Sequence, residues 1–159
     1  MTLEKYSSPA GSIIFAAHEG AICGLWFEGQ KYEKRGLDES LLPDAKDREV
    51  LVRCVQWLDA YFSGKAQGID FPLCPQGTAF QKKVWRELCS IPHGETASYG
   101  DIARCIGCKS ARAVGAAVGK NPISILVPCH RVLGADKSLT GYAGGIERKK
   151  FLLALEGIL

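Results

Sequence analysis

The tripeptide Cys129-His130-Arg131 has the residue types best suited to chemistry in this chain of 159 residues. A thiol reacts as the thiolate, and a neighbouring histidine or arginine favours that form. Pro128 restricts the backbone before the cysteine, and the apolar run at 123–127 predicts an anchor in the core. The pattern indicates a nucleophilic Cys129 on a rigid element. Because adjacent side chains often diverge, a structural thiol beside a solvated imidazole is the alternative for this pair alone.

Residues 98–119 predict two short helices joined by a turn that contains Gly107. This is the layout of a helix-turn-helix, whose second helix enters a DNA groove, although any helical hairpin with a glycine in its turn looks similar. The second helix, 111–119, consists of Ala, Val and Gly with one arginine, Arg112. Small residues allow a close backbone approach, which suits the minor groove with one inserted side chain. A tightly packed, buried helix is the alternative.

Positive charge is concentrated in the second half of the chain. Residues 1–75 contain 8 Lys and Arg against 11 Asp and Glu, whereas residues 76–159 contain 12 against 6. The basic half favours a polyanionic partner such as nucleic acid, and a chance distribution over a solvated surface is the alternative.

The first half of the chain predicts a small unit of strands and one helix. Residues 11–27 have the pattern of a β-hairpin, and 28–46 that of a loop. Residues 47–62 have apolar positions at helical spacing, with Asp47 as the predicted N-cap. The turn-rich stretch 63–77 is interpreted as a linker.

The second half predicts mainly helices. Thr78, Ser98 and Ser110 each precede a helical pattern and are predicted as N-caps. Residues 145–156 predict a final amphipathic helix. In that helix Lys149 and its basic neighbours are interpreted either as phosphate contacts or as a solvated face.

Composition excludes several classes of protein. With 47% hydrophobic and 23% charged residues, the chain is typical of a globular protein rather than a disordered one. It has no apolar run long enough for a membrane span and no secretory signal, so a cytoplasmic protein without membrane contact is expected. The seven cysteines are odd in number and irregular in spacing, which argues against a disulfide framework and against a structural zinc site.

Several motifs together resemble the O6-alkylguanine-DNA alkyltransferase family. They are SYGDIA, RAVGAA, NPISILVPCHRV, GYAGG and LEG, in this order within residues 61–159, whereas residues 1–60 match only in size and in the hairpin. The resemblance implies a DNA repair protein that moves the alkyl group of O6-alkylguanine to its own cysteine, once per molecule and without a cofactor. The implied partner is double-stranded DNA carrying this lesion, with O4-alkylthymine left open as a second substrate, and the chain is expected to be a monomer.

The resemblance implies a reaction centre of five residues. Cys129 would accept the alkyl group, and His130 would deprotonate it through a water molecule. Glu156 would orient His130, and Asn121 would brace the turn that carries Cys129. Tyr99 would donate to the guanine and drive base flipping.

The resemblance also implies residues that contact DNA and form the pocket. Arg112 would fill the gap left by the flipped base, and Tyr142 with the backbone amide of Ala143 would donate to O6. The other implied DNA contacts are Ser98, Ala111, Ala113 and Gly115, and the other implied pocket residues are Ser124, Pro128, Arg131 and Val132. Some family members carry Ser at 143 or Pro at 124, so the tolerance for bulky alkyl groups is left open.

The predicted fold class is α+β, in two parts. By resemblance, residues 1–72 form a ribonuclease H-like α/β domain and residues 76–159 a mainly helical domain with the helix-turn-helix at 98–119 and the active site at 128–132. The two parts are expected to meet through an apolar interface supplied by the predicted helices at 47–62 and 78–89.

Two other functions compete with alkyl transfer. A damage-recognition protein would use the same helices and pocket without chemistry, but such relatives replace the cysteine that is present here. An unrelated thiol hydrolase or redox protein would use Cys129 and His130 but leaves Arg112 and the basic second half unexplained.

Overall fold

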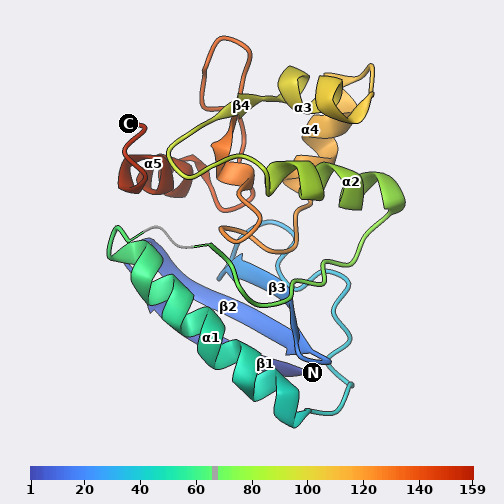
Figure 1. The fold of residues 1–159 in the computed structure, drawn as a ribbon, viewed down its shortest axis with the longest axis vertical. Helices are drawn as coiled ribbons and strands as arrows, with labels where there is room; N and C mark the ends of the chain where they lie inside the picture. The colour runs from blue at the N-terminus through green and yellow to red at the C-terminus, as the bar shows by residue number, and fades with distance from the viewer. Residues whose placement is uncertain (66–67) are drawn as a thin grey trace.

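The computed structural model describes residues 1–65 and 68–159, which form two parts stacked along the long axis of the molecule (Figure 1). The lower part in this view contains a sheet and one long helix, and the upper part contains the remaining helices. The elements are β1 (Thr2–Ser8), β2 (Gly11–His18), β3 (Ala21–Phe27), α1 (Ala45–Phe62), α2 (Ala79–Leu88), β4 (Ala97–Ser98), α3 (Tyr99–Ile106), α4 (Ala111–Gly119), the 3-10 turn η1 (Cys129–Arg131), β5 (Val132–Leu133) and α5 (Ile146–Leu155).

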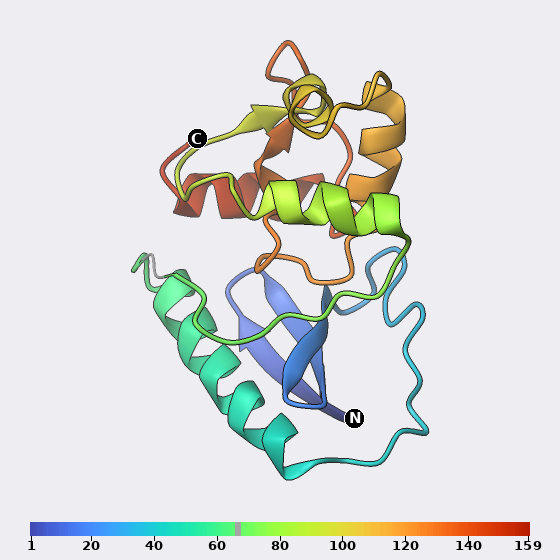
Figure 2. The same ribbon diagram turned by 45° about the vertical axis from the view of Figure 1, so that its right-hand side comes forward.

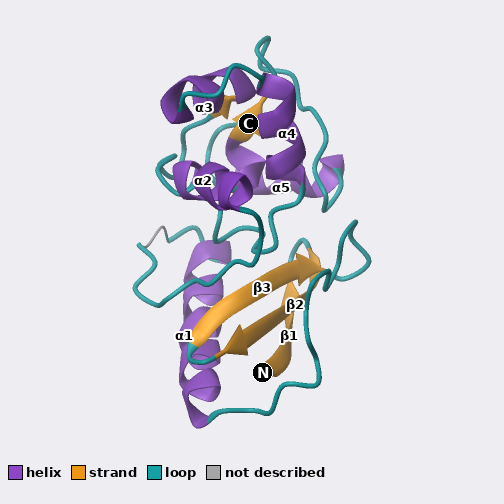
Figure 3. Cartoon of the chain, turned by 90° about the vertical axis from the view of Figure 1, so that its right-hand side faces the viewer, coloured by secondary structure: helices purple, strands orange, loops and turns teal. Residues whose placement is uncertain are grey.

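The sheet of the first part is antiparallel, in the order β1-β2-β3, and α1 packs against it (Figure 3). The predicted hairpin is confirmed as β2 and β3, and both residues of its turn, Glu19 and Gly20, have positive φ. This geometry is typical of tight hairpin turns. Strand β1 was not predicted, because its sequence is mostly polar and it is an edge strand with partly exposed residues.

Helix α1 begins earlier than predicted, and its cap is Asp44 rather than Asp47. The Asp44 side chain accepts a hydrogen bond from the backbone N–H of Lys46. Asp47 is instead fully buried, accepts from the Gly20 backbone N–H at 3.0 Å and lies 3.8 Å from the N-terminal ammonium. Its carboxylate therefore ties α1 to the hairpin turn.

The three N-caps predicted in the second half are confirmed. Thr78, Ser98 and Ser110 each accept a backbone hydrogen bond from the third residue of the helix that follows. Helices α3 and α4 form the predicted helical hairpin, and Gly107 ends α3 in the left-handed conformation with φ of 70°. Among residues 1–65 and 68–159, no helix is long and apolar enough to cross a membrane.

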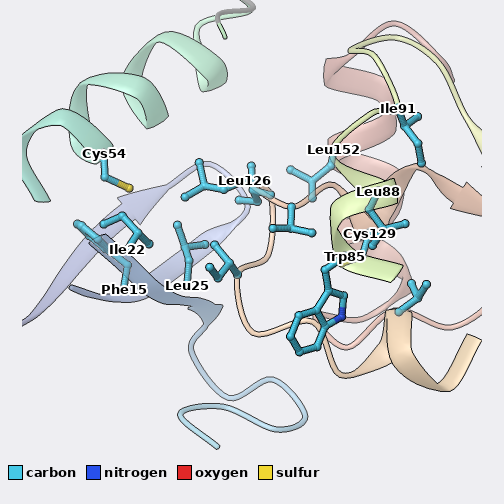
Figure 4. Close-up of a cluster of buried hydrophobic side chains, with 14 of the residues drawn as sticks. Phe15, Ile22, Leu25, Cys54, Trp85, Leu88, Ile91, Leu126, Cys129 and Leu152 are labelled. Atoms are coloured by element: carbon cyan, nitrogen blue, oxygen red, sulfur yellow. The ribbon is translucent and has the colours of Figure 1, made fainter. Parts of the chain in front are cut away.

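A segment that was not expected at the interface joins the two parts. The Leu25 N–H donates to the Pro122 carbonyl and the Ser124 N–H donates to the Leu25 carbonyl, both at 2.9 Å. Figure 2 shows this segment, in orange, between the sheet and the upper helices. The interface is apolar, and one buried cluster runs from the sheet through Leu126 to α2 and Cys129 (Figure 4). The two helices expected to supply it pack mainly elsewhere, α1 on the sheet and α2 on α3 and α4.

Candidate active site

Asn121 holds the segment that leads to Cys129. Its buried side-chain amide donates to the Val127 carbonyl at 2.8 Å and to the Ile123 carbonyl at 3.3 Å. Its side-chain oxygen accepts from the Ile123 N–H at 3.0 Å. These bonds close the turn in which Ile125 has a φ of 70°, an uncommon value for a β-branched residue. The backbone before Cys129 is thus fixed from within by one side chain.

The thiol of Cys129 is buried and protonated at rest. Only 5% of the residue is exposed, at the start of η1. Burial raises the pKa of the Cys129 thiol, although the Asn121 amide and the Lys149 ammonium act in the opposite direction. A thiol in this state needs a base beside it to become a nucleophile.

His130, the residue after Cys129 in the chain, forms a buried pair with Glu156. Nε2 of His130 lies 2.5 Å from Oε2 of Glu156. Burial alone would raise the pKa of Glu156, but hydrogen bonds from His130, Arg131 and Tyr61 outweigh it and hold the pKa well below its usual range. Burial lowers the pKa of His130, against the influence of Glu156. Because an ionised carboxylate only accepts, the neutral imidazole carries its proton on Nε2.

This arrangement leaves Nδ1 of His130 as a proton acceptor. Nδ1 is buried and has no hydrogen-bond partner among residues 1–65 and 68–159. With its tautomer fixed by Glu156, the imidazole can take up a proton at this atom. The side chain is therefore built as a base.

The carboxylate of Glu156 is held by more donors than the sequence indicated. Arg131 Nε donates to Oε1 at 2.7 Å, and the Gly94 N–H donates to the same oxygen at 3.3 Å. The Tyr61 hydroxyl donates to Oε2 at 2.7 Å from the end of α1, 95 residues away in the chain. Tyr61 was missed because no local pattern links it to Glu156.

A cavity of about 440 Å³ opens beside Cys129. Tyr99 and Gly115 from the helical hairpin line it, together with Tyr142 and Ala143, which the resemblance assigned to the pocket. Its other lining residues are Lys31, Tyr32, Ala116, Val118, Gly119, Lys120 and Gly141. The loop after β3 was not expected here, and its Lys31 N–H donates to the Ala143 carbonyl at 3.2 Å.

Four residues assigned to the pocket by resemblance do not line this cavity. Pro128 and Arg131 border a different cavity, because the Arg131 guanidinium is held by Glu156 and by the Ile91 carbonyl at 2.7 Å. Ser124 and Val132 are buried in the surrounding structure.

Two tyrosines present hydroxyl groups near this cavity. The Tyr142 hydroxyl is buried without a hydrogen bond of good geometry among the described residues, and burial raises its pKa well above the usual value. Cys129 also raises that pKa, whereas Ser124 lowers it. The Tyr99 hydroxyl accepts from Thr140 Oγ1 at 3.0 Å. Both phenols can donate protons at the cavity.

The helical hairpin lies at the end of the molecule away from the sheet (Figure 3). Ala111 and Arg112 are exposed on α4, and Arg112 makes no ion pair or hydrogen bond within the described residues. Ala113 and Ser98 are half-buried, and the Ser98 hydroxyl is engaged as the cap of α3. The exposed surface of α4 is therefore built of small residues around one free guanidinium.

Two of the three basic residues of α5, Arg148 and Lys149, differ from both interpretations of the sequence. Lys149 is fully buried, so it is neither a solvated residue nor a phosphate contact. The Arg148 guanidinium donates to the carbonyls of Ala10 and Gly144 and lies 4.8 Å from the centre of the Phe27 ring. Only Lys150 is exposed as expected.

Known proteins share both halves of this chain. Residues 1–75 match the ribonuclease-like domain of 6-O-methylguanine DNA methyltransferase, and residues 79–158 match its DNA binding domain. The methylated-DNA–protein-cysteine methyltransferase of Methanosarcina acetivorans is 46% identical over 96% of each chain. That of Mycobacterium tuberculosis is 47% identical over 94% of this chain and 88% of its own length.

Solved structures agree with these sequence matches. The crystal structure of the Mycobacterium tuberculosis protein in complex with DNA has a TM-score of 0.85 and 44% identity, covering 97% of this chain and 91% of that one. A Methanococcus jannaschii O6-methylguanine DNA methyltransferase has a TM-score of 0.68 and 27% identity, covering 100% and 93%. The fold and these matches define a DNA-repair transferase of the α+β class. The chain belongs to the 6-O-methylguanine DNA methyltransferase family.

Proposed function

We propose that this protein repairs O6-methylguanine in double-stranded DNA by moving the methyl group to Cys129. The observation that carries the proposal is the buried Cys129 thiol, which borders a cavity and is followed by the His130–Glu156 pair. The cavity volume of about 440 Å³ lies within the range typical of small-molecule pockets. The methyl donor is the lesion itself, so the reaction needs no cofactor.

The first step is deprotonation of the thiol. Nδ1 of His130, acting through a water molecule, accepts the Cys129 proton, and the Glu156 carboxylate stabilises the imidazolium that forms. Because the His130–Glu156 pair is shielded from solvent, this stabilisation is stronger than it would be in water.

The second step is displacement at the methyl carbon. The thiolate forms the new sulfur–carbon bond while the carbon–oxygen bond to O6 breaks, and its electron pair passes to the guanine. A proton from Tyr99 or Tyr142 neutralises the leaving base, and the tyrosinate regains a proton from the solvent, to which the imidazolium of His130 returns the proton that it took from Cys129. The product is a thioether on Cys129, which no residue of the site can reverse, so each molecule acts once.

The lesion reaches the cavity only outside the base stack. We propose that α4 enters the minor groove, where Ala111, Ala113 and Gly115 permit close approach and Arg112 fills the vacated space. The free guanidinium and the small exposed residues of α4 support this geometry. We assign residues 76–159 to the reaction and residues 1–72 to its support. We also propose action in the cytoplasm, where the seven free thiols would stay reduced.

Intact-mass spectrometry tests the proposal directly. The protein is mixed with duplex DNA containing O6-methylguanine, with Cys129→Ser in parallel and undamaged duplex as the control. We expect one methyl group per protein chain, mapped to Cys129 and absent from the variant. Lesion binding without the adduct would instead support damage recognition. An absence of both would point to an unrelated thiol enzyme, to be tested with ester and disulfide substrates.

A further inference from the structure

The hydroxyl of Tyr99 has one hydrogen-bond partner among the described residues, Thr140. Thr140 lies in the loop between β5 and α5, and its Oγ1 donates to the Tyr99 oxygen at 3.0 Å. Tyr99 lines the cavity beside Cys129, whereas Thr140 does not. The side-chain hydroxyl of Thr140 thus meets the cavity through the Tyr99 hydroxyl.

The ring of Tyr99 lies against α4, which restricts its movement. A Cβ atom placed on Gly115 would lie 3.6 and 3.7 Å from two atoms of this ring, so the ring rests against α4. The phenol oxygen lies on the ring axis and moves little when the ring turns. The remaining freedom is rotation of the O–H bond, which decides where the proton points.

Thr140 removes that freedom. When its hydroxyl donates to the phenol oxygen, the phenol proton must point elsewhere. A phenol that accepts one hydrogen bond is also polarised and becomes a better donor in a second. Both effects favour donation from Tyr99 to a group in the cavity.

The backbone of Thr140 is held in turn by the buried Lys149. Its ammonium donates to the Thr140 carbonyl at 3.0 Å and to the Val132 carbonyl at 2.7 Å. No carboxylate lies within ion-pair distance of Lys149 in the described part of the chain. A buried ammonium is costly unless it is hydrogen-bonded, so these two carbonyls are the partners that keep it in place. One side chain on α5 therefore holds both Thr140 and the strand β5, from which the loop that carries Thr140 begins.

We propose that Thr140 is a positioning residue for methyl transfer, which aims the phenol proton of Tyr99 at the damaged base in the cavity. This inference rests on the proposed function. It assigns Thr140 no contact with the base and no part in activating Cys129.

A double-mutant cycle tests this route. Single-turnover rates of methyl transfer are measured for the wild type, Thr140→Val, Thr140→Ser, Tyr99→Phe and the double variant Tyr99→Phe/Thr140→Val. We expect Thr140→Val to slow transfer about fivefold, the effect of one hydrogen bond. Thr140→Ser keeps the donor and should react close to the wild-type rate. In the Tyr99→Phe background, Thr140→Val should cost nothing further, because the oxygen it acts on is gone.

Alkylation of Cys129 by iodoacetamide is the matched control. It reports the reactivity of the thiol without any base in the cavity, and we expect the same rate in the wild type, Thr140→Val and Thr140→Ser. If the wild type forms no methyl adduct, the proposed function fails and this inference fails with it. If the wild type reacts but Thr140→Val reacts equally fast, or is slowed equally in both backgrounds, the inference alone is overturned. A Thr140→Ser variant that is folded yet as slow as Thr140→Val would also overturn it.

Discussion

The proton held between His130 and Glu156 decides how the buried thiol becomes reactive. Burial keeps both the imidazole and the Cys129 thiol neutral at rest, while Glu156 stays ionised under four hydrogen-bond donors. The thiolate therefore forms when the base accepts its proton during the reaction, not as a stable anion beforehand. Two predictions follow at the scale of single residues.

Replacing Glu156 by Gln should slow methyl transfer about a hundredfold or more, in the range of a lost acid–base function. The amide cannot stabilise the imidazolium, and it leaves the buried Arg131 guanidinium without its counter-charge. Single-turnover transfer from O6-methylguanine DNA measures the effect. Glu147→Gln, on an exposed glutamate of α5, is the matched control and should react as the wild type. Equal rates for Glu156→Gln and the control would contradict the assigned role.

The pH dependence follows from the lowered pKa of His130. Because the pKa of His130 lies below the ordinary histidine value of 6.5, the imidazole is still neutral at pH 6.5. The fall of the transfer rate on the acid side should therefore occur below pH 6.5. A depressed histidine pKa also means that the unfolded chain binds the proton first. The contribution of His130 to the free energy of unfolding is therefore complete above pH 6.5. It is lost as the pH falls from 6.5 toward the pKa of His130 in the folded state. Transfer rates and denaturant unfolding between pH 5 and 8 test both effects, and an acid limb above pH 6.5 would contradict them.

Part of this site could be predicted from local residue types, and the rest depends on contacts between residues far apart in the sequence. Cys129 and His130 are adjacent, so their chemistry is visible in the sequence. Asn121 and Glu156 were reached only through the family resemblance. Tyr61 had no signal at all, since its bond to Glu156 depends on how α1 packs against the rest of the molecule.

At the scale of elements, α4 combines two conflicting requirements. Glycine weakens a helix, yet Gly115 lies where the helix borders the cavity and the Tyr99 ring. The caps of α2, α3 and α4 were predictable because a cap depends on neighbouring residues only. The start of α1 was not predictable, because Asp44 and Asp47 are both suitable N-caps by residue type. Asp44 caps the helix, and Asp47 instead accepts a hydrogen bond from Gly20 in the hairpin turn.

Gly115→Ala should separate the stability of helix α4 from the space that the cavity and DNA require. The added methyl meets Tyr99 at an ordinary contact distance of 3.6 Å, so the free energy of unfolding should rise by up to about 1 kcal/mol. The same methyl narrows the cavity and the approach to DNA, so methyl transfer should slow. Denaturant unfolding and single-turnover transfer are measured on the same preparation. A variant that is both more stable and fully active would show that the glycine serves no functional contact.

At the scale of the whole molecule, the first part of the chain contributes contacts to the candidate site in the second part. The sheet holds the Asn121 segment by backbone hydrogen bonds at Leu25, and α1 supplies Tyr61 to Glu156. The α+β class was predictable from composition and periodicity. The segment at 122–124 that joins the two parts was not predictable, because backbone hydrogen bonds between distant stretches do not depend on a pattern of side chains.

Tyr61→Phe tests this dependence. The ring keeps its stacking on Trp57 at 5.1 Å, but the carboxylate loses one donor. The free energy of unfolding should fall by about 1.5–3 kcal/mol, as for a hydrogen bond to a charged group. Tyr6→Phe is the matched control, because it removes an exposed hydrogen bond from the Tyr6 hydroxyl to Asp59, which lies on α1 as Tyr61 does. This variant should lose less free energy of unfolding. Equal losses in urea unfolding would show that the buried bond carries no special weight.

The bond between Tyr61 and Glu156 also bears on inheritance. A recombination event that passed on only the second half of the gene would encode a glutamate one donor short and a reactive segment without its sheet. Such a fragment would have to acquire substitutes for both before selection could keep it as a working repair protein. The two halves are therefore expected to be inherited together in one gene, and substitutions near the end of α1 are expected to be accompanied by substitutions around Glu156.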